Sequence, residues 1–138
     1  MKLSAKLKES VVSEIRLASS QMKIAQRPLD KIYFFSAVFG VTNRVMNIEF
    51  DPELAFVHHV TNACYNLMTS SLLLISQGQM TNTITPEVFS KIEAILDELA
   101  LNIEKGESTY QTLESLSNTT YIMSGNGYYL YLKKIIKL

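Results

Sequence analysis

The stretch "DPELAFVHHVTNACYNLM" (Asp51–Met68) decides the expected fold. Proline suits the first helical position because its fixed φ is already helical and its missing N–H needs no partner there. The aspartate before it can cap the same helix end. We therefore expect a helix of about 25 residues that begins at Asp51.

This helix lies in a run from Leu54 to Pro86 that contains no Asp, Glu, Lys or Arg. A membrane span is not expected from that run, because two histidines, two asparagines and several Ser and Thr residues would carry polar groups into hydrocarbon. The helix instead has two faces. A heptad stripe is expected in the core, made of Val57, Val60, Cys64, Leu67, Ser71 and Leu74. The other face is polar but uncharged, made of His58 or His59, Asn62, Asn66, Thr69 and Ser70.

The rest of the chain shows helical signals and no convincing strand. Arg27-Pro28 and Thr85-Pro86 predict two more helix starts, and Gly78 and Gly106 predict helix ends. Apolar residues recur at helical spacing from Leu7 to Ala25, from Ile32 to Asn43 without any charge, and from Val88 to Glu104. For residues 107–138 we favour one long helix with a kink at Gly125 and Gly127, with two shorter helices as the alternative.

These elements predict an all-α, antiparallel, up-and-down bundle of four or five helices in a single domain, residues 1–138. The helices around 32–43 and 51–75 are expected to be the most buried, because they lack a charged face. No internal repeat or low-complexity tract is present.

Charge and cysteine content limit the possible partners. The chain has 13 basic and 13 acidic residues, so its net charge is zero and nothing global attracts it to nucleic acid or to a membrane. The single cysteine, Cys64, cannot form an internal disulfide, and the first residues carry lysines in place of an apolar targeting segment. We therefore expect a cytoplasmic protein without a membrane partner.

The two charge signs are nevertheless unevenly distributed along the chain. Residues 1–31 hold seven basic and three acidic side chains, and residues 87–114 hold two basic and seven acidic ones. The two corresponding helices are expected to lie near each other, within one subunit or across an interface. The alternative is that the first helix and the tail "YYLYLKKIIKL" form a basic, tyrosine-rich surface for nucleic acid or membrane.

The candidate site residues lie on the uncharged polar face. His58, His59, Asn62 and Asn66, with Tyr33 or Tyr65, are candidates for an interface or for a small-molecule pocket. His58 and His59 are also the candidate metal ligands, although adjacent residues point about 100° apart on a helix and neither has Cys64 four residues away. No Glu-x-x-His pair, glycine-rich phosphate loop or nucleophile with a base is present, so we favour a protein without catalytic activity or cofactor.

One resemblance concerns layout. A short chain with proline-initiated helices and an uncharged central helix after "FDPELAF" resembles small uncharacterised helical-bundle proteins of archaeal genomes. The resemblance implies the bundle and no functional residue. Cobalamin adenosyltransferases also use such bundles, but their glycine-rich nucleotide loop and arginine-rich helix are missing here.

Together these observations predict a non-catalytic protein that acts through self-association, with a dimer favoured, or through a protein partner. A small-molecule or metal-binding bundle that uses the face from His58 to Ser70 is the first alternative. A basic-surface nucleic-acid binder is the second.

Overall fold

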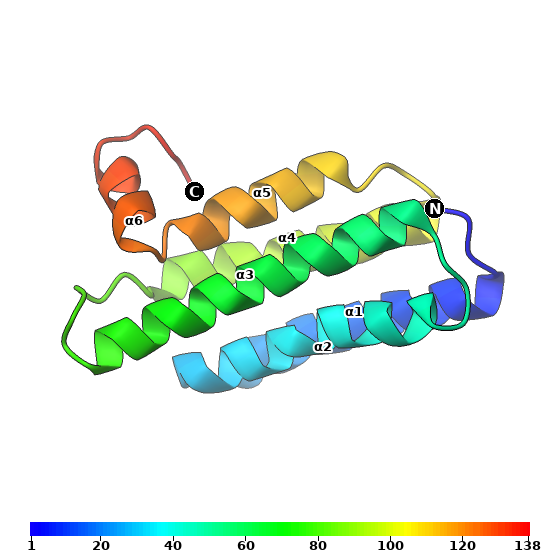
Figure 1. Ribbon diagram of the computed structural model, residues 1–138, viewed down its shortest axis with the longest axis horizontal. Coiled ribbons are helices and arrows are strands. Elements are labelled where there is room, and N and C mark those ends of the chain that lie inside the picture. The colour runs from blue at the N-terminus through cyan, green and yellow to red at the C-terminus, as the bar shows by residue number, and fades with distance from the viewer.

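A computed structural model describes all 138 residues. The chain folds into six helices and contains no strand. Their bounds are α1 (Ala5–Ile24), α2 (Pro28–Met46), α3 (Pro52–Ser76), α4 (Pro86–Lys105), α5 (Tyr110–Tyr121) and α6 (Gly125–Leu132). Helices α1 to α5 alternate in direction along one long axis, and α6 lies beyond the end of α5 (Figure 1). The predicted all-α, up-and-down bundle is confirmed.

The helix boundaries follow the proline and glycine signals. Pro28, Pro52 and Pro86 each begin a helix. The Asp51 carboxylate accepts hydrogen bonds from the backbone N–H groups of Glu53 and Leu54, at 2.9 and 3.0 Å. At the other ends of α3 and α4, Gly78 and Gly106 adopt positive φ angles of 70° and 71°. These are left-handed conformations that glycine adopts at little cost.

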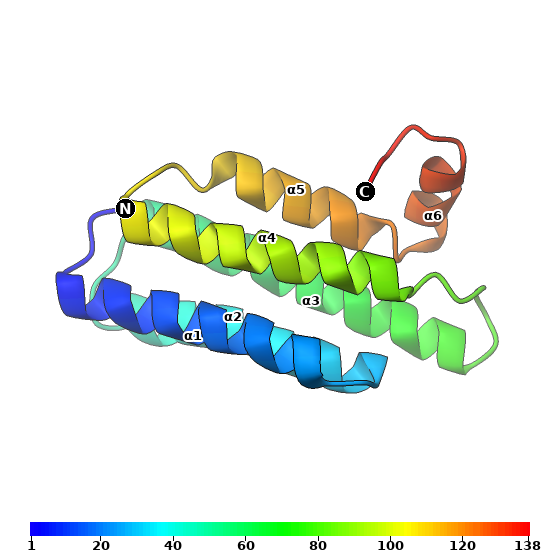
Figure 2. The same ribbon diagram turned by 180° about the vertical axis from the view of Figure 1, so that it is seen from behind.

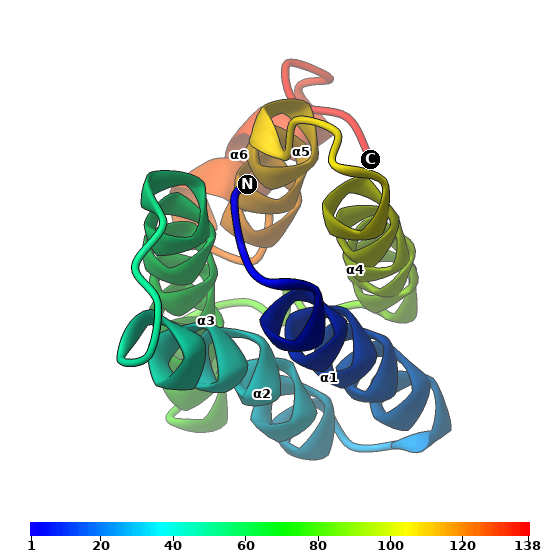
Figure 3. The same cartoon turned by 90° about the vertical axis from the view of Figure 1, so that its right-hand side faces the viewer.

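The five long helices form a ring in the order α1, α2, α3, α5, α4, as the view along the bundle shows (Figure 3). Helix α4 follows α3 in the chain but packs against α1 and α5, and α5 lies between α3 and α4. The connection of residues 77–85 crosses the end of the bundle to make this possible. From behind, α1 and α4 lie side by side (Figure 2).

The core corrects the expectation that the helices around 32–43 and 51–75 are the most buried. Helix α4 contributes the most buried residues of any helix. They are Val88, Phe89, Ile92, Glu93, Ile95, Leu96, Leu99, Ala100, Asn102 and Ile103. Helices α2 and α3 each bury one stripe and expose the opposite side. The uncharged stretches of these two helices, residues 32–43 and 54–76, therefore include exposed surface as well as core.

The buried stripe of α3 also differs in part from the predicted one. It consists of Leu54, Val57, Thr61, Cys64, Met68 and Ser71. Val60 and Leu67 are only half-buried, and Leu74 is exposed. Thr61 can occupy a core position because its hydroxyl donates to the backbone carbonyl of Val57 at 2.8 Å, which satisfies its polar group within the helix.

Residues 107–138 form two helices, so the favoured single kinked helix is wrong. The Ser124 hydroxyl caps α6 by accepting from the Gly127 N–H at 3.0 Å. A backbone oxygen, that of Tyr121, lies only 1.7 Å from the position that a Cβ on Gly127 would occupy. Gly127 thus allows a sharp junction between α5 and α6 that the helical spacing of apolar residues did not reveal.

The opposite charges of α1 and α4 meet within one subunit. This is the first of the two predicted arrangements; the other placed the contact across an interface between subunits. Arg16 pairs with Glu104 at 2.8 Å, and Lys23 pairs with Asp97 at 2.8 Å. All four side chains are about half exposed, so these pairs favour the correct helix pairing while contributing little to stability.

Candidate functional site

The outer surface of α3 is the candidate site. Because Leu54, Val57 and the other stripe residues face the core, the opposite side of the helix faces solvent. We call that side the uncharged face of α3 and define it as His59, Asn62, Asn66, Thr69, Ser70 and Leu73. All six are exposed except the half-buried Asn62. A solvent-facing helix normally carries Lys and Glu on this side, and here none is present.

His58 is separated from this face by its contacts with α2. Its Nδ1 lies 3.1 Å from the Phe39 carbonyl oxygen and 3.0 Å from the Thr42 hydroxyl. The Thr42 hydroxyl also lies 2.9 Å from the Phe39 carbonyl, and because a carbonyl oxygen can only accept, Nδ1 of His58 acts as the donor in its contact with Phe39. His58 therefore links α2 to α3.

His59 points to solvent, and its ring centroid lies 5.4 Å from that of His58 in an edge-to-face arrangement. Of the two histidines that the sequence allowed on the polar face, His59 is the one that lies there. Within the whole chain, no group of three or more His, Cys, Asp or Glu side chains is placed to hold a metal ion.

The two candidate tyrosines lie in different surroundings. Tyr65 packs in the seam between α2 and α3, where its ring centroid is 5.0 Å from that of Phe39. Tyr33 is 69% exposed on α2 and contacts Phe34 edge to face. The structure brings Tyr65 and His58 together around Phe39, and it leaves Tyr33 outside that group.

Asn62 and Asn66 form no side-chain hydrogen bond with another part of the chain, so their amides are available to a partner. The five best-defined surface pockets are lined by other residues. Asn62 and Asn66 therefore lie on open helix surface and not in one of these hollows.

An apolar flank adjoins the uncharged face at one end of the molecule. Leu73 on α3 is 56% exposed, and Leu29 and Tyr33 on α2 are 58% and 69% exposed. Helices α2 and α3 run antiparallel, so the first turns of α2 lie beside the last turns of α3 (Figure 1). Exposed Leu and Tyr beside uncharged polar residues are typical of the centre of a protein interface, where charged residues are depleted.

Cys64 lies on the inner side of α3 and is 4% exposed. Burial raises the pKa of its thiol, with a hydrogen bond to Thr120 acting in the opposite direction. A buried neutral thiol is a poor nucleophile and metal ligand, which agrees with its predicted place in the core.

A groove between α3 and α5 was not predicted. The rings of Phe56 and Tyr110 stack at 4.8 Å, and beside them lies a pocket of about 340 Å³. Its lining residues are Phe56, Val60, Tyr110, Leu113, Glu114, Ser117 and Asn118. No sequence signal could have found it, because α3 and α5 are neighbours only through the crossing of residues 77–85.

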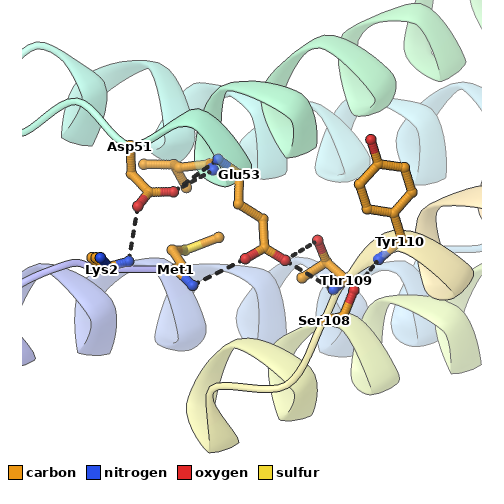
Figure 4. A network of polar contacts seen from close by, with 8 residues as sticks. Met1, Lys2, Asp51, Glu53, Ser108, Thr109 and Tyr110 are labelled. Carbon is orange, nitrogen blue, oxygen red and sulfur yellow. Dashed lines mark hydrogen bonds and ion pairs between the residues drawn. The ribbon is translucent and has the colours of Figure 1, made fainter.

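A polar network lies next to Tyr110, which lines this groove (Figure 4). Glu53 accepts from the N–H and hydroxyl of Thr109, at 3.0 and 2.9 Å, and pairs with the Met1 amino group at 3.0 Å. Asp51 accepts from the Lys2 N–H at 2.8 Å. The first turn of α3 is thereby tied both to the chain before α1 and to the start of α5.

The comparisons with known proteins add no relative. None of the helices of this chain is long and apolar enough to cross a bilayer. Searches of protein-family models, curated proteins and solved structures find no match. The resemblance in layout to archaeal bundle proteins therefore stays a prediction.

Proposed function

We propose that this protein is a non-catalytic assembly protein that forms a dimer through the uncharged face of α3 and the adjoining Leu29 and Tyr33 of α2. The observation that carries the proposal is that this face is exposed and yet uncharged. After Glu53, no residue of α3 is Asp, Glu, Lys or Arg. Lys and Glu are common on surface that stays in contact with water, whereas they are depleted at the centre of a protein interface.

A second copy of the same chain fits this face well. Asparagine, serine and threonine side chains each carry a donor and an acceptor, so a row of them can bond to an identical row across a two-fold axis. No like charges would meet in such a pairing. Leu73, Leu29 and Tyr33 supply the apolar area that a stable contact requires.

The donor groups on this face favour assembly over a small-molecule or metal site. His58 bonds to α2 through Nδ1 and has only Nε2 left for a ligand, and His59 adds one further imidazole. Zinc takes three or four ligands, and no group of three His, Cys, Asp or Glu side chains is placed to hold it. Asn62 and Asn66 line none of the pockets described above, which disfavours a small-molecule site. A cytoplasmic location is part of the proposal, and the lone buried Cys64 supports it.

The test is native mass spectrometry and light scattering of the full chain, with Asn66→Lys as the interface variant. Ser115→Lys, which adds the same charge on the exposed outer side of α5, is the matched control. We expect a dimer for the wild type and for Ser115→Lys, and a monomer for Asn66→Lys, because two added lysines would meet near the two-fold axis.

Two results would overturn the proposal. One is a wild-type monomer at concentrations of tens of micromolar. The other is a dimer that both lysine variants weaken equally. Extra mass on the wild type that a chelator removes would instead support the metal alternative, with His59 as its first candidate ligand.

A further inference from the structure

The C-terminal segment forms a basic surface of its own. No Asp or Glu follows Glu114 in the chain, and the last stretch contains Lys133, Lys134 and Lys137. All three lysines are exposed. None takes part in an ion pair, in contrast to Arg16, Lys23 and Lys31 of the bundle. The positive charge of this segment is therefore available to a partner.

The fold turns three apolar side chains of the same segment outward. The chain reverses after α6 at Lys134, whose φ is +61°, and the N–H groups of Ile135 and Ile136 both approach the Leu130 carbonyl, at 2.9 and 3.4 Å. Tyr128, Tyr131 and Ile136 pack against the core and hold the segment in place. Tyr129, Leu132 and Ile135 are left 59%, 60% and 68% exposed.

The neighbouring surface adds no charge of its own over residues 77–85. This connection contacts the junction before α6, where the Thr83 hydroxyl bonds to the Met123 carbonyl. Both the connection and α6 lie at the same end of the bundle (Figures 1 and 2). That end therefore presents exposed tyrosine, leucine and isoleucine side chains among three free lysines.

We propose that this end of the molecule binds peripherally to the surface of an anionic lipid bilayer. Lysines near such a surface are attracted by its negative potential, and tyrosine rings favour the headgroup level. Exposed leucine and isoleucine gain by entering the acyl boundary. The sequence by itself led us to expect no membrane partner, and the proposal concerns attachment to one leaflet and no span.

Nucleic acid fits this surface less well. Single-stranded nucleic acid is held by several exposed aromatic rings on which bases stack. Here only Tyr129 is exposed among the three tyrosines of α6, and Lys133 lies over its ring at 5.6 Å. Exposed aliphatic side chains gain nothing from phosphates, whereas they gain from hydrocarbon.

The absence of tryptophan in the chain allows a clean test. Leu132→Trp places a single fluorophore in the proposed contact, and Leu17→Trp places one on an exposed site of α1, where the leucine is 58% exposed. Each full-length variant is mixed with vesicles of phosphatidylcholine alone or with added phosphatidylserine. We expect a blue shift and quenching by brominated lipid for Leu132→Trp with the anionic vesicles only, and neither change for Leu17→Trp.

Charge is tested separately by vesicle flotation. Lys133→Gln, Lys134→Gln and Lys137→Gln are combined in one variant, and the control combines Lys6→Gln, Lys8→Gln and Lys105→Gln, which lie at the opposite end of the bundle. The first variant is expected to lose at least tenfold in binding to anionic vesicles, because each lysine contributes to the attraction. The control should bind like the wild type.

The proposal is wrong if the wild type does not float with anionic vesicles, or if both triple variants lose binding equally. It is also wrong if the fluorophore of the Leu132→Trp variant stays in water while the chain binds a single-stranded RNA oligonucleotide in a manner that depends on the same three lysines. This last outcome would assign the surface to nucleic acid.

Discussion

Gly127 lies where the first turn of α6 passes the last carbonyls of α5. The space that its missing side chain leaves is filled by backbone, with the Tyr121 carbonyl oxygen 1.7 Å and the carbonyl carbon 2.4 Å from the position of a Cβ. Backbone cannot move aside as the end of a flexible side chain can. This glycine is thus required by close approach, and not by an unusual φ angle.

Gly127→Ala is expected to lower the free energy of unfolding by about 3 kcal/mol, because the junction between α5 and α6 must open to admit a methyl group. Gly40→Ala is the matched control. Gly40 lies inside α2, and the nearest atom to its Cβ position is in the Arg44 side chain at 3.9 Å. That substitution should stabilise the chain by about 0.5–1 kcal/mol. Urea unfolding followed by circular dichroism measures both; a loss from Gly40→Ala as large as that from Gly127→Ala would contradict the argument.

At the residue scale, the sequence predicted the roles of single residues better than it predicted which way their side chains point. Pro52, Gly78 and Cys64 have the predicted roles because each depends on local backbone or on simple burial. The choice between His58 and His59 could not be made, because it depends on the Phe39 carbonyl and the Thr42 hydroxyl of another helix. The sequence likewise could not decide between Tyr33 and Tyr65 as candidate site residues, because their surroundings depend on contacts with other parts of the fold.

At the scale of elements, the first turn of α3 joins three parts of the chain through two carboxylates. Burial acts to raise the pKa of Asp51, but hydrogen bonds from the N–H groups of Lys2, Leu54 and Glu53 outweigh it, and the pKa lies below its ordinary value. Burial also acts to raise the pKa of Glu53, but hydrogen bonds from Thr109 and the Met1 amino group outweigh it, so this pKa too lies below its ordinary value. Folding therefore favours the ionised form of both groups.

This linkage predicts acid sensitivity. A carboxylate whose pKa is lower in the folded state contributes stability above its ordinary pKa and loses that contribution as the pH falls through the folded pKa. The free energy of unfolding should therefore decrease as the pH is lowered below about 5. Asp51→Asn combined with Glu53→Gln should lower stability at neutral pH and flatten this decrease. Glu98→Gln, which changes an exposed α4 carboxylate with no ion pair, serves as the control and should keep the wild-type slope.

The ion pair between Arg16 of α1 and Glu104 of α4 can be tested by reversing its two charges. Arg16→Glu should destabilise the chain slightly, because it places two carboxylates where the Arg16–Glu104 pair now lies. Adding Glu104→Arg should restore most of the loss by re-forming the pair in reverse. A double-mutant cycle of thermal unfolding measures the coupling, which exposed pairs keep small. Additive effects of the two changes would show that the pair contributes nothing.

The boundary between α5 and α6 shows what periodicity leaves open. Leu113, Leu116, Thr120, Met123 and Gly127 are spaced as in one helix, and all five are buried. The spacing persists because both helices face the same core, while the Ser124 cap and Gly127 change the direction of the chain between them. A pattern of burial therefore predicts which residues face inward and leaves the path of the backbone undetermined.

At the scale of the whole molecule, the ring order could not be predicted from the chain order. Helical patterns and short connections favour consecutive helices as neighbours, and α4 departs from this rule by packing against α1. The opposite charges of α1 and α4 were the one signal of that contact. The groove between α3 and α5 follows from the same departure, which explains why no sequence argument found it.

The two proposed surfaces differ in their physics, and salt should separate them. The face of α3 is uncharged, so dimerisation through it should change by no more than about twofold between low and high salt. The C-terminal surface acts through lysines, so binding to anionic vesicles should fall at least tenfold over the same range. Sedimentation equilibrium and flotation, carried out on the same preparation, measure the two quantities. A dimer that dissociates with added salt would place its contacts on charged residues and move the interface away from α3.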